Sequence, residues 1–185
     1  MNRVLERRPG RGRQCPVGAT HGIASTAMAV DLFLKIDGID GESNDAKHKG
    51  EIEIESFSWG ASAPGTAGPG GGGGSTGRVT MEDFSFTTPV TRATPKLFLA
   101  CVERRRIKTA LLTVRRSGGQ QHDFLKVTMS DVQISAWNQA SDAESPMDQV
   151  SMNFGKVQIA YTGQRPDGTP GETVTASWDS KNTKI

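Results

Sequence analysis

Apolar and polar residues alternate in several short segments of the chain, which is the pattern of half-buried β-strands. In residues 30–36 every second side chain is apolar, and the turn-forming residues 37–41 follow. Similar patterns predict strands in residues 51–59, 78–86, 107–116, 123–137, 151–161 and 173–179. The chain is therefore predicted to be mainly β, and its sequence contains no internal repeat.

Four of these segments share a reversal, in which the apolar side chains change from one face of the strand to the other. In the segment 51–59, Ile52 and Ile54 share one face, and Phe57 and Trp59 then share the opposite face. The other reversals fall in residues 79–86, 127–134 and 152–161. A β-bulge inserts one residue and produces such a reversal. Strands of this kind bend strongly or serve both sides of a barrel, so we predict a small antiparallel β-barrel of two sheets with one flanking α-helix.

Residues 94–104 carry the pattern of that helix. Thr94 is expected to cap it, with Pro95 at the first helical position, where its missing N–H costs nothing. The expected apolar face consists of two pairs of residues four positions apart, Leu97 with Cys101 and Phe98 with Val102.

Length and composition narrow the class of protein. The 185 residues are enough for one domain with a sizeable core. Two cysteines on their own cannot make a disulfide framework or a four-ligand zinc site, and three histidines leave little material for a metal site. The sequence has no run of about 18 apolar residues that would span a membrane. We therefore expect neither membrane insertion nor a cofactor.

The net charge of +2 hides a division of the chain into two parts. Residues 1–27 hold five arginines and one acid, which leaves 17 basic and 19 acidic residues in 28–185. We predict that 1–27 is a disordered basic extension and that 28–185 is a single barrel domain. Two alternatives stay open for 1–27. It could be a basic arm that binds nucleic acid, or the start codon could be misassigned upstream, with Met28 as the true first residue. The acidic domain itself does not favour nucleic-acid binding, and 1–27 lacks the continuous apolar segment of a signal peptide.

Charged residues gather in two regions that we predict to be interaction surfaces. One is the polar loop 42–50 with the strand that follows it, and the other is the end of the helix. A mildly acidic domain with a local basic patch can associate head to tail with its own copies. The alternatives for the basic patch are phosphate binding and capping of the helix. The predicted interface residues are Asp45, Lys47, His48, Lys49, Glu51, Glu53, Arg104, Arg105 and Arg106.

A hydrolase and a carbohydrate-binding β-sandwich are the two alternative classes of protein. A hydrolase would need the Asp45/His48 or the His122/Asp123 cluster to line a pocket beside a nucleophile, and neither has the sequence context of an activated nucleophile. We therefore expect no enzyme. A carbohydrate-binding β-sandwich would expose tryptophans for stacking on sugars, unless they belong to the core. The three tryptophans are Trp59, Trp137 and Trp178.

Several motifs along residues 28–180 resemble the haemolysin-coregulated protein (Hcp) family of type VI secretion systems, and their order and number make the match specific. The matching segments are 29–43, 45–49, 56–60, 83–86, 93–101, 112–115, 124–126, 146–149 and 178–179. Residues 1–27 depart from the pattern of the family.

The resemblance implies a structural protein rather than an enzyme. Members of the family form hexameric rings that stack into a tube inside a contractile sheath, beneath a spike, and carry small effectors in the lumen. The resemblance further implies a protein that is cytoplasmic before assembly and is then exported without a cleaved signal. In the family an extended loop at the position of 42–50 reaches the adjacent subunit or ring. Reversing Lys47 and Lys49 to Glu is therefore expected to leave rings intact and to impair stacking.

Overall fold

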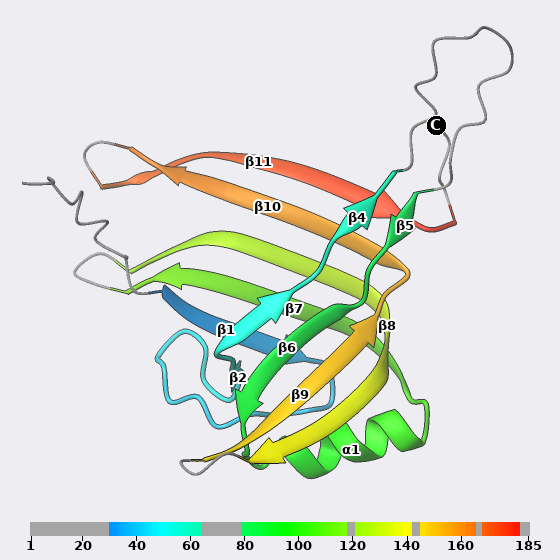
Figure 1. The fold of residues 1–185 in the computed structure, drawn as a ribbon. Coiled ribbons are helices and arrows are strands. Elements are labelled where there is room, and N and C mark those ends of the chain that lie inside the picture. Colours follow the sequence, from blue (N-terminus) through cyan, green and yellow to red (C-terminus); the bar gives the residue numbers. More distant parts are fainter. Residues whose placement is uncertain (1–29, 64–78, 118–120, 142–144, 166–167, 182–185) are drawn as a thin grey trace, which may run out of the picture.

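The computed structural model describes residues 30–63, 79–117, 121–141, 145–165 and 168–181 (Figure 1). The prediction for the basic extension 1–27 falls outside these residues, as does the glycine-rich segment 65–77. The elements, in chain order, are β1 (Val30–Ile36), β2 (Ile52–Glu53), β3 (Ser56–Ser58), β4 (Ala61–Ser62), β5 (Thr80–Met81), β6 (Phe84–Pro89), α1 (Thr94–Val102), β7 (Arg106–Arg116), β8 (His122–Ser141), β9 (Pro146–Asn153), β10 (Lys156–Gln164) and β11 (Pro170–Asp179).

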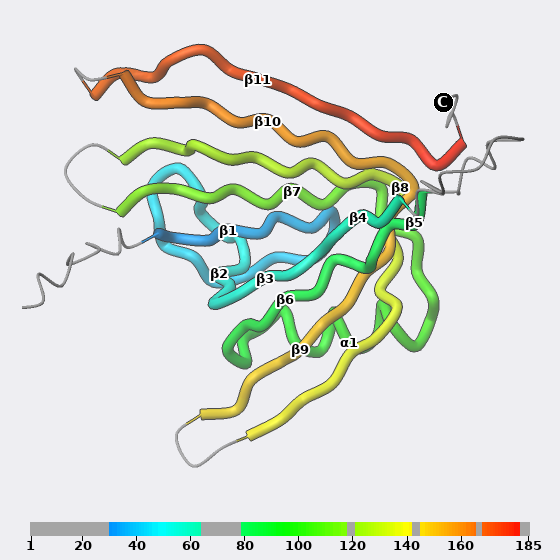
Figure 2. The backbone as a smooth tube through the Cα atoms, turned by 45° about the horizontal axis from the view of Figure 1, so that its top comes forward, coloured from blue at the N-terminus to red at the C-terminus, as the bar shows by residue number. Residues whose placement is uncertain are grey.

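Nine strands form one antiparallel sheet in the order β2-β1-β7-β8-β9-β6-β3, from which β10 branches to pair with β8, and β11 pairs with β10. Strands β4 and β5 form a separate two-stranded ribbon. The large sheet folds into two layers, one with β1, β7, β10 and β11 and the other with β6 and β9 (Figures 1 and 2). The prediction of a mainly β protein with one helix is confirmed.

The long strand β8 passes from one layer into the other. Its first half pairs with β10, Ser130 opposite Lys156, and its second half pairs with β9, Gln133 opposite Asn153. Between these halves Asp131 adopts a left-handed conformation with φ 54°, where few residues other than glycine are found. Across from it, a Cβ on Gly155 would lie 3.1 Å from the Asp131 Cβ, so a side chain there would push Asp131 away by a few tenths of an ångström.

The predicted reversals of face are therefore present, but their cause differs from the prediction. The β7–β8 register continues across Asp131 without a shift, so the reversal in β8 is a change of backbone conformation and not an inserted bulge residue. In the three other segments the strand breaks in two, giving β2 and β3, β5 and β6, and β9 and β10. Such a break lets one segment contribute to both layers, as the barrel prediction required.

The strand pairing does not close into a complete barrel. The two ends of the sheet, β2 and β3, belong to one segment of the chain that crosses from the first layer to the second. Two backbone hydrogen bonds mark the crossing, from Ile54 N–H to the Leu32 carbonyl at 3.1 Å and from Glu55 N–H to the Thr87 carbonyl at 2.9 Å. The predicted β-barrel of two sheets thus takes the form of two facing layers that are joined by short crossing segments.

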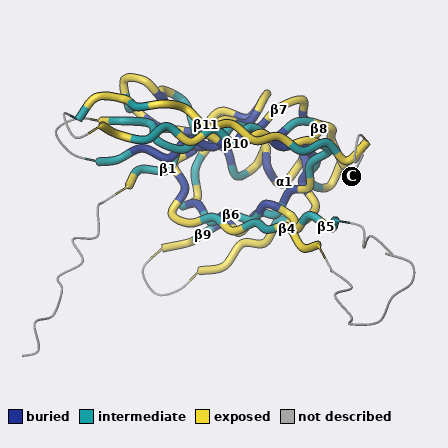
Figure 3. Tube along the Cα trace, turned by 90° about the horizontal axis from the view of Figure 1, so that it is seen from above, coloured by how far each residue is buried: buried dark blue, intermediate teal, exposed yellow. Residues whose placement is uncertain are grey.

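Buried residues lie in both facing layers (Figure 3), and their apolar side chains form the core. Residues of both layers contribute. Five of the large core side chains are 0% exposed: Leu34, Phe84, Leu112, Met129 and Met152. This single core extends under the helix, where Leu97 and Ala100 are buried. Within the described residues no helix is long and apolar enough to span a membrane.

The helix differs from its prediction at both ends and on one face. Ala93 precedes its first turn without a side-chain cap, and Thr94 instead donates its hydroxyl to the buried carboxylate of Asp148 on β9. Of the expected apolar pairs, Phe98 is 44% and Val102 64% exposed, so that pair faces outward. Each residue advances the side-chain direction by 100°, so a helix that turns Leu97 toward the core turns the pair Phe98 and Val102 away from it.

Candidate functional site: a buried arginine and the loop it holds

The loop 42–50 is folded on itself rather than extended. Its base is closed by hydrogen bonds from Gly41 N–H to the Gly50 carbonyl and from Gly50 N–H to the Ser43 carbonyl, each 2.8 Å. Within the loop, Asp45 Oδ1 accepts the backbone N–H groups of Lys47 at 2.8 Å and His48 at 3.1 Å. This is the Asx-type turn that aspartate favours, so the local sequence itself organises the tip of the loop.

The base of the loop leaves no room for a side chain at Gly41. A Cβ built there would lie 2.3 Å from the carbonyl oxygen of Glu51 and 2.6 Å from the Cα of Ile52. Both neighbours are backbone atoms of the returning strand, so they cannot rotate away. Glycine is required here to let the two chain segments approach.

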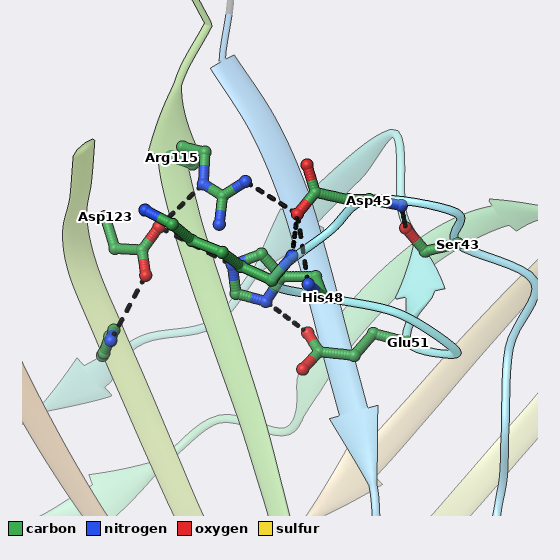
Figure 4. Close-up of polar contacts among 8 residues, drawn as sticks. Ser43, Asp45, His48, Glu51, Arg115 and Asp123 are labelled. Atoms are coloured by element: carbon green, nitrogen blue, oxygen red, sulfur yellow. Dashed lines mark hydrogen bonds and ion pairs between the residues drawn. The ribbon is translucent and has the colours of Figure 1, made fainter. Parts of the chain in front are cut away.

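Arg115, near the end of β7, attaches this loop to the sheet (Figure 4). Its side chain is 0% exposed. Its Nε donates to Asp123 Oδ1 on β8 at 2.8 Å, and its Nη1 donates to Asp45 Oδ1 at 2.9 Å. The guanidinium carbon also lies 5.3 Å from the centre of the Phe33 ring, in cation–π distance. One buried cation therefore joins the loop to the strands β1, β7 and β8.

His48 forms a second attachment beside the first. It is 6% exposed, and its ring stacks on Phe33 with 4.3 Å between ring centres and 11° between planes. Its Nδ1 lies 2.8 Å from Glu51 Oε2, a hydrogen-bond distance, whereas its Nε2 lies 3.6 Å from Asp123 Oδ1. Among the described residues, His48 Nε2 and Arg115 Nη2 are buried without a hydrogen-bond partner.

Electrostatics favour the charged forms of Asp45, Asp123 and Arg115. The Lys47 N–H, followed by the Arg115 guanidinium, lowers the pKa of Asp45 below its usual value. Burial acts to raise the pKa of Asp123, but the hydrogen bond and charge of Arg115 outweigh burial, and that pKa is lowered as well. Burial acts in the opposite sense on Arg115, and its two carboxylate partners raise its pKa overall.

The structure divides the predicted interface residues into two groups. Asp45, His48 and Glu51 are engaged within the cluster, so the expectation of a wholly exposed loop is wrong for them, because the buried arginine and Phe33 bind them internally. The exposed group consists of Lys47, Lys49, Glu53, Arg104, Arg105 and Arg106. Sequence analysis missed the role of Arg115, although an arginine directly after the buried run 112–114 is a signal of a paired buried charge.

Opposite charges lie near the two ends of β1. Near its first residues is a hollow of about 340 Å³, which we call the acidic hollow, lined by Val30, Asp31, Leu32, Phe33, Asp45, Glu53 and Ile54. Beyond its last residue is an exposed basic group made up of Arg104, Arg105, Arg106 and Lys108. Arg105 Nη2 would lie 3.5 Å from a Cβ on Gly38, which places it just past the end of β1. Within the described residues the basic group makes no ion pair.

The geometry does not assemble a hydrolytic site. The two sequence clusters do meet, since Asp45, His48 and Asp123 surround Arg115 (Figure 4). However, the Ser43 hydroxyl accepts the Asp45 N–H at 3.3 Å and is not bound to His48. In the described part of the chain, no group of three or more histidine, cysteine, aspartate or glutamate side chains is arranged to hold a metal ion.

The tryptophans do not form exposed platforms for sugars. All three are half-buried and pack against the core. Trp59 meets the edge of Phe154, with ring centres 6.2 Å apart, and Trp137 meets Phe98 at 5.2 Å. The core interpretation of these residues is therefore the one the packing supports.

Comparison with known proteins gives one consistent result. Residues 33–161 match the family model described as "Type VI secretion system effector, Hcp". The chain is 38% identical over 156 residues to the protein hcp1 of Pseudomonas aeruginosa, an alignment that covers 82% of this chain and 96% of that protein.

Solved structures agree with the sequence match. The crystal structure of Hcp1 from Salmonella typhimurium superposes with a TM-score of 0.70 at 33% identity, covering 85% of this chain and 99% of the other. A structure titled as a type six secretion system protein superposes with a TM-score of 0.78 at 28% identity, covering 84% and 99%. On the family match, the sequence identity and the shared fold, this chain belongs to the Hcp family of type VI secretion proteins.

Proposed function

We propose that the chain is a ring-forming subunit of the inner tube of a type VI secretion system. In this proposal hexameric rings stack into a tube that lies in the contractile sheath, meets the spike protein and carries small effectors out of the cell. The subunit has no catalytic role and is cytoplasmic until assembly. Family membership supports the tube component, and the surface of β10–β11 supports association between copies.

The single observation that carries the association is the uncovered apolar face of β10–β11. Tyr161 is paired with Val174 across these strands, and the two are 47% and 65% exposed. Tyr161 lies on the same face of β10 as the buried Val157, so Tyr161 and Val174 continue the inner face of the sheet beyond its buried part. Strand β11 is also ten residues long and pairs on one edge only. A long exposed edge with an apolar face is a surface that native proteins normally cover.

The charges near the ends of β1 supply a direction for stacking. The acidic hollow of one copy and the basic group of the next are complementary if successive rings stack head to tail. Glu51 is bound by His48, so Glu53 is the glutamate of the predicted pair that is free to face the arginines. Lys47 and Lys49 lie on the loop at the acidic end, and their partners in a neighbouring ring are the exposed acids beside its basic group, such as Asp37 and Glu103.

Ring formation is tested with Val174→Glu and a matched control. The control is Thr175→Glu, because Thr175 is an exposed neighbour whose side chain points to the opposite face of β11. Native mass spectrometry of the wild type should give a ring, Val174→Glu should give monomers, and Thr175→Glu should keep the ring. A monomeric wild type, or equal effects of both variants, would contradict the proposal.

Stacking is tested separately with the double variant Lys47→Glu/Lys49→Glu. We expect rings of normal mass that fail to form tubes under the electron microscope and are not exported. Lys35→Glu, a reversal of an exposed lysine on β1, serves as the control for a general charge effect. Loss of the rings, or undiminished tubes, would show that the loop has a different role.

A further inference from the structure

We infer that Arg115 is a positioning residue that fixes the loop 42–50 on the β7–β8 strands, so that Lys47 and Lys49 meet the next copy from one defined place. The inference rests on the proposed role of this loop in stacking. It adds a residue that is itself inaccessible to any partner, since Arg115 is 0% exposed.

Arg115 and the backbone of Lys47 are bound by the same oxygen atom of Asp45. Asp45 Oδ1 accepts both the Arg115 guanidinium, at 2.9 Å, and the backbone N–H of Lys47, at 2.8 Å. The position of the Lys47 backbone therefore follows directly from the position of Arg115. No flexible side chain intervenes except the short one of aspartate.

The Arg115 side chain is held in place by residues of the sheet. Its Nε is bound to Asp123 at 2.8 Å, and the Phe33 ring lies beside the guanidinium. Asp123 is bound in turn by Lys126, with 3.3 Å between Nζ and Oδ2. The anchor thus belongs to the sheet, and the loop takes its position from the sheet rather than from its own flexibility.

Stability alone gives a poor account of this arginine. Burying a guanidinium is costly, and replacing a whole buried ion-pair cluster by apolar side chains of similar volume is often neutral or stabilising for folding. Here the cost is higher still, because Nη2 is buried without a partner in the described residues. These observations fit a buried charge that positions the loop rather than stabilises the fold, because the donors of the planar guanidinium have fixed directions.

The test uses Arg115→Lys, which keeps the buried charge and removes the fork. Lysine reaches one carboxylate at a time, so Asp123 retains its partner and Asp45 loses the anchor. Asp45 itself is unchanged and still accepts the N–H groups of Lys47 and His48. Faster exchange of those two amides in the isolated ring therefore reports a loosened loop and not a deleted acceptor.

The matched control is Arg116→Lys, the same substitution at the next residue, where the guanidinium bonds to Gln164 near the surface at 2.7 Å. We expect Arg115→Lys to keep the ring mass, to raise exchange at Lys47 and His48 at least tenfold, and to reduce tube formation. Arg116→Lys should change none of these. If Arg115→Lys does not fold, Asp45→Ala leaves the Arg115–Asp123 pair in place and should give the same loss of stacking.

The outcomes separate this inference from the proposed function. Unchanged amide exchange in Arg115→Lys, or loosened loops that still stack normally, overturns the positioning role while the lysine reversals still abolish stacking. If the lysine reversals leave tubes intact, the role of the loop in stacking falls first, and the positioning inference falls with it. A loosened loop with intact rings and lost tubes supports both.

Discussion

Replacing Arg115 with methionine tests how the buried cluster contributes to folding. Methionine has similar length and no charge, so the change removes the ion pairs at 2.8 Å and 2.9 Å while filling most of the space. It leaves Asp45 and Asp123 facing each other with side chains 20% and 21% exposed. Removing one partner of a buried ion pair costs about 3–5 kcal/mol. Because both carboxylates keep some contact with water, we expect a loss of about 2–4 kcal/mol for Arg115→Met.

The measurement is thermal and urea unfolding of Arg115→Met, Asp123→Asn and the double variant. For a domain of this size the expected loss corresponds to a Tm lower by on the order of 5–15 °C. The double variant should cost less than the sum of the single ones, because it removes the uncompensated charge, with a coupling of about 1–3 kcal/mol. A loss below about 0.5 kcal/mol, as at an ordinary surface site, or strict additivity would refute the assignment of Arg115 as a buried, paired cation.

Three further changes give distinct outcomes. Gly41→Ala should lower the free energy of unfolding in urea by about 2–3 kcal/mol, since its Cβ would lie 2.3 Å from a backbone oxygen. Gly50→Ala has open space around its Cβ but a φ of 74°, so it should lower the free energy of unfolding by about 1–2 kcal/mol. Leu97→Ala, at a fully buried position, should lower the free energy of unfolding by about 2–5 kcal/mol, while Val102→Ala, 64% exposed, should change it by less than about 0.5 kcal/mol. The carboxylates bound by Arg115 have pKa values lowered from 3.8, so their stabilisation is present above the unfolded-state pKa and is lost as the pH falls through the lowered pKa values. Acid titration of stability should show this loss in the wild type and a smaller one in Arg115→Met, where the Lys47 N–H still lowers the pKa of Asp45.

The strand pattern was predictable because burial on one face leaves a period of two in the sequence. This signal located β1, β7 and both halves of β8, and the reversals of face correctly indicated chain segments shared by two layers. It gave the wrong physical cause at Asp131, because a left-handed aspartate and an inserted residue reverse the pattern in the same way. Closure of the barrel was not predictable either, since hydrogen-bond partners at the sheet ends leave no periodic trace.

The candidate site shows a similar division. The charged loop was identified by its polarity, and its exposed members Lys47 and Lys49 were placed correctly. Burial of His48 was missed, because it depends on stacking against Phe33 from a different segment. Arg115 was missed for the same reason: its partners Asp45 and Asp123 are 70 and 8 residues away in the sequence. Contacts of this kind follow from the fold and not from local composition.

The bend in β8 at Asp131 has a consequence for how the molecule unfolds. Since β8 hydrogen-bonds to β10 before the bend and to β9 after it, neither layer can open without breaking the ladder of a strand that it shares with the other. Local opening confined to one layer is therefore suppressed, and the central amides of both layers should exchange with the free energy of global unfolding. We therefore expect the described strands to unfold as one cooperative unit, so that partly opened states with exposed strand edges are rarely populated.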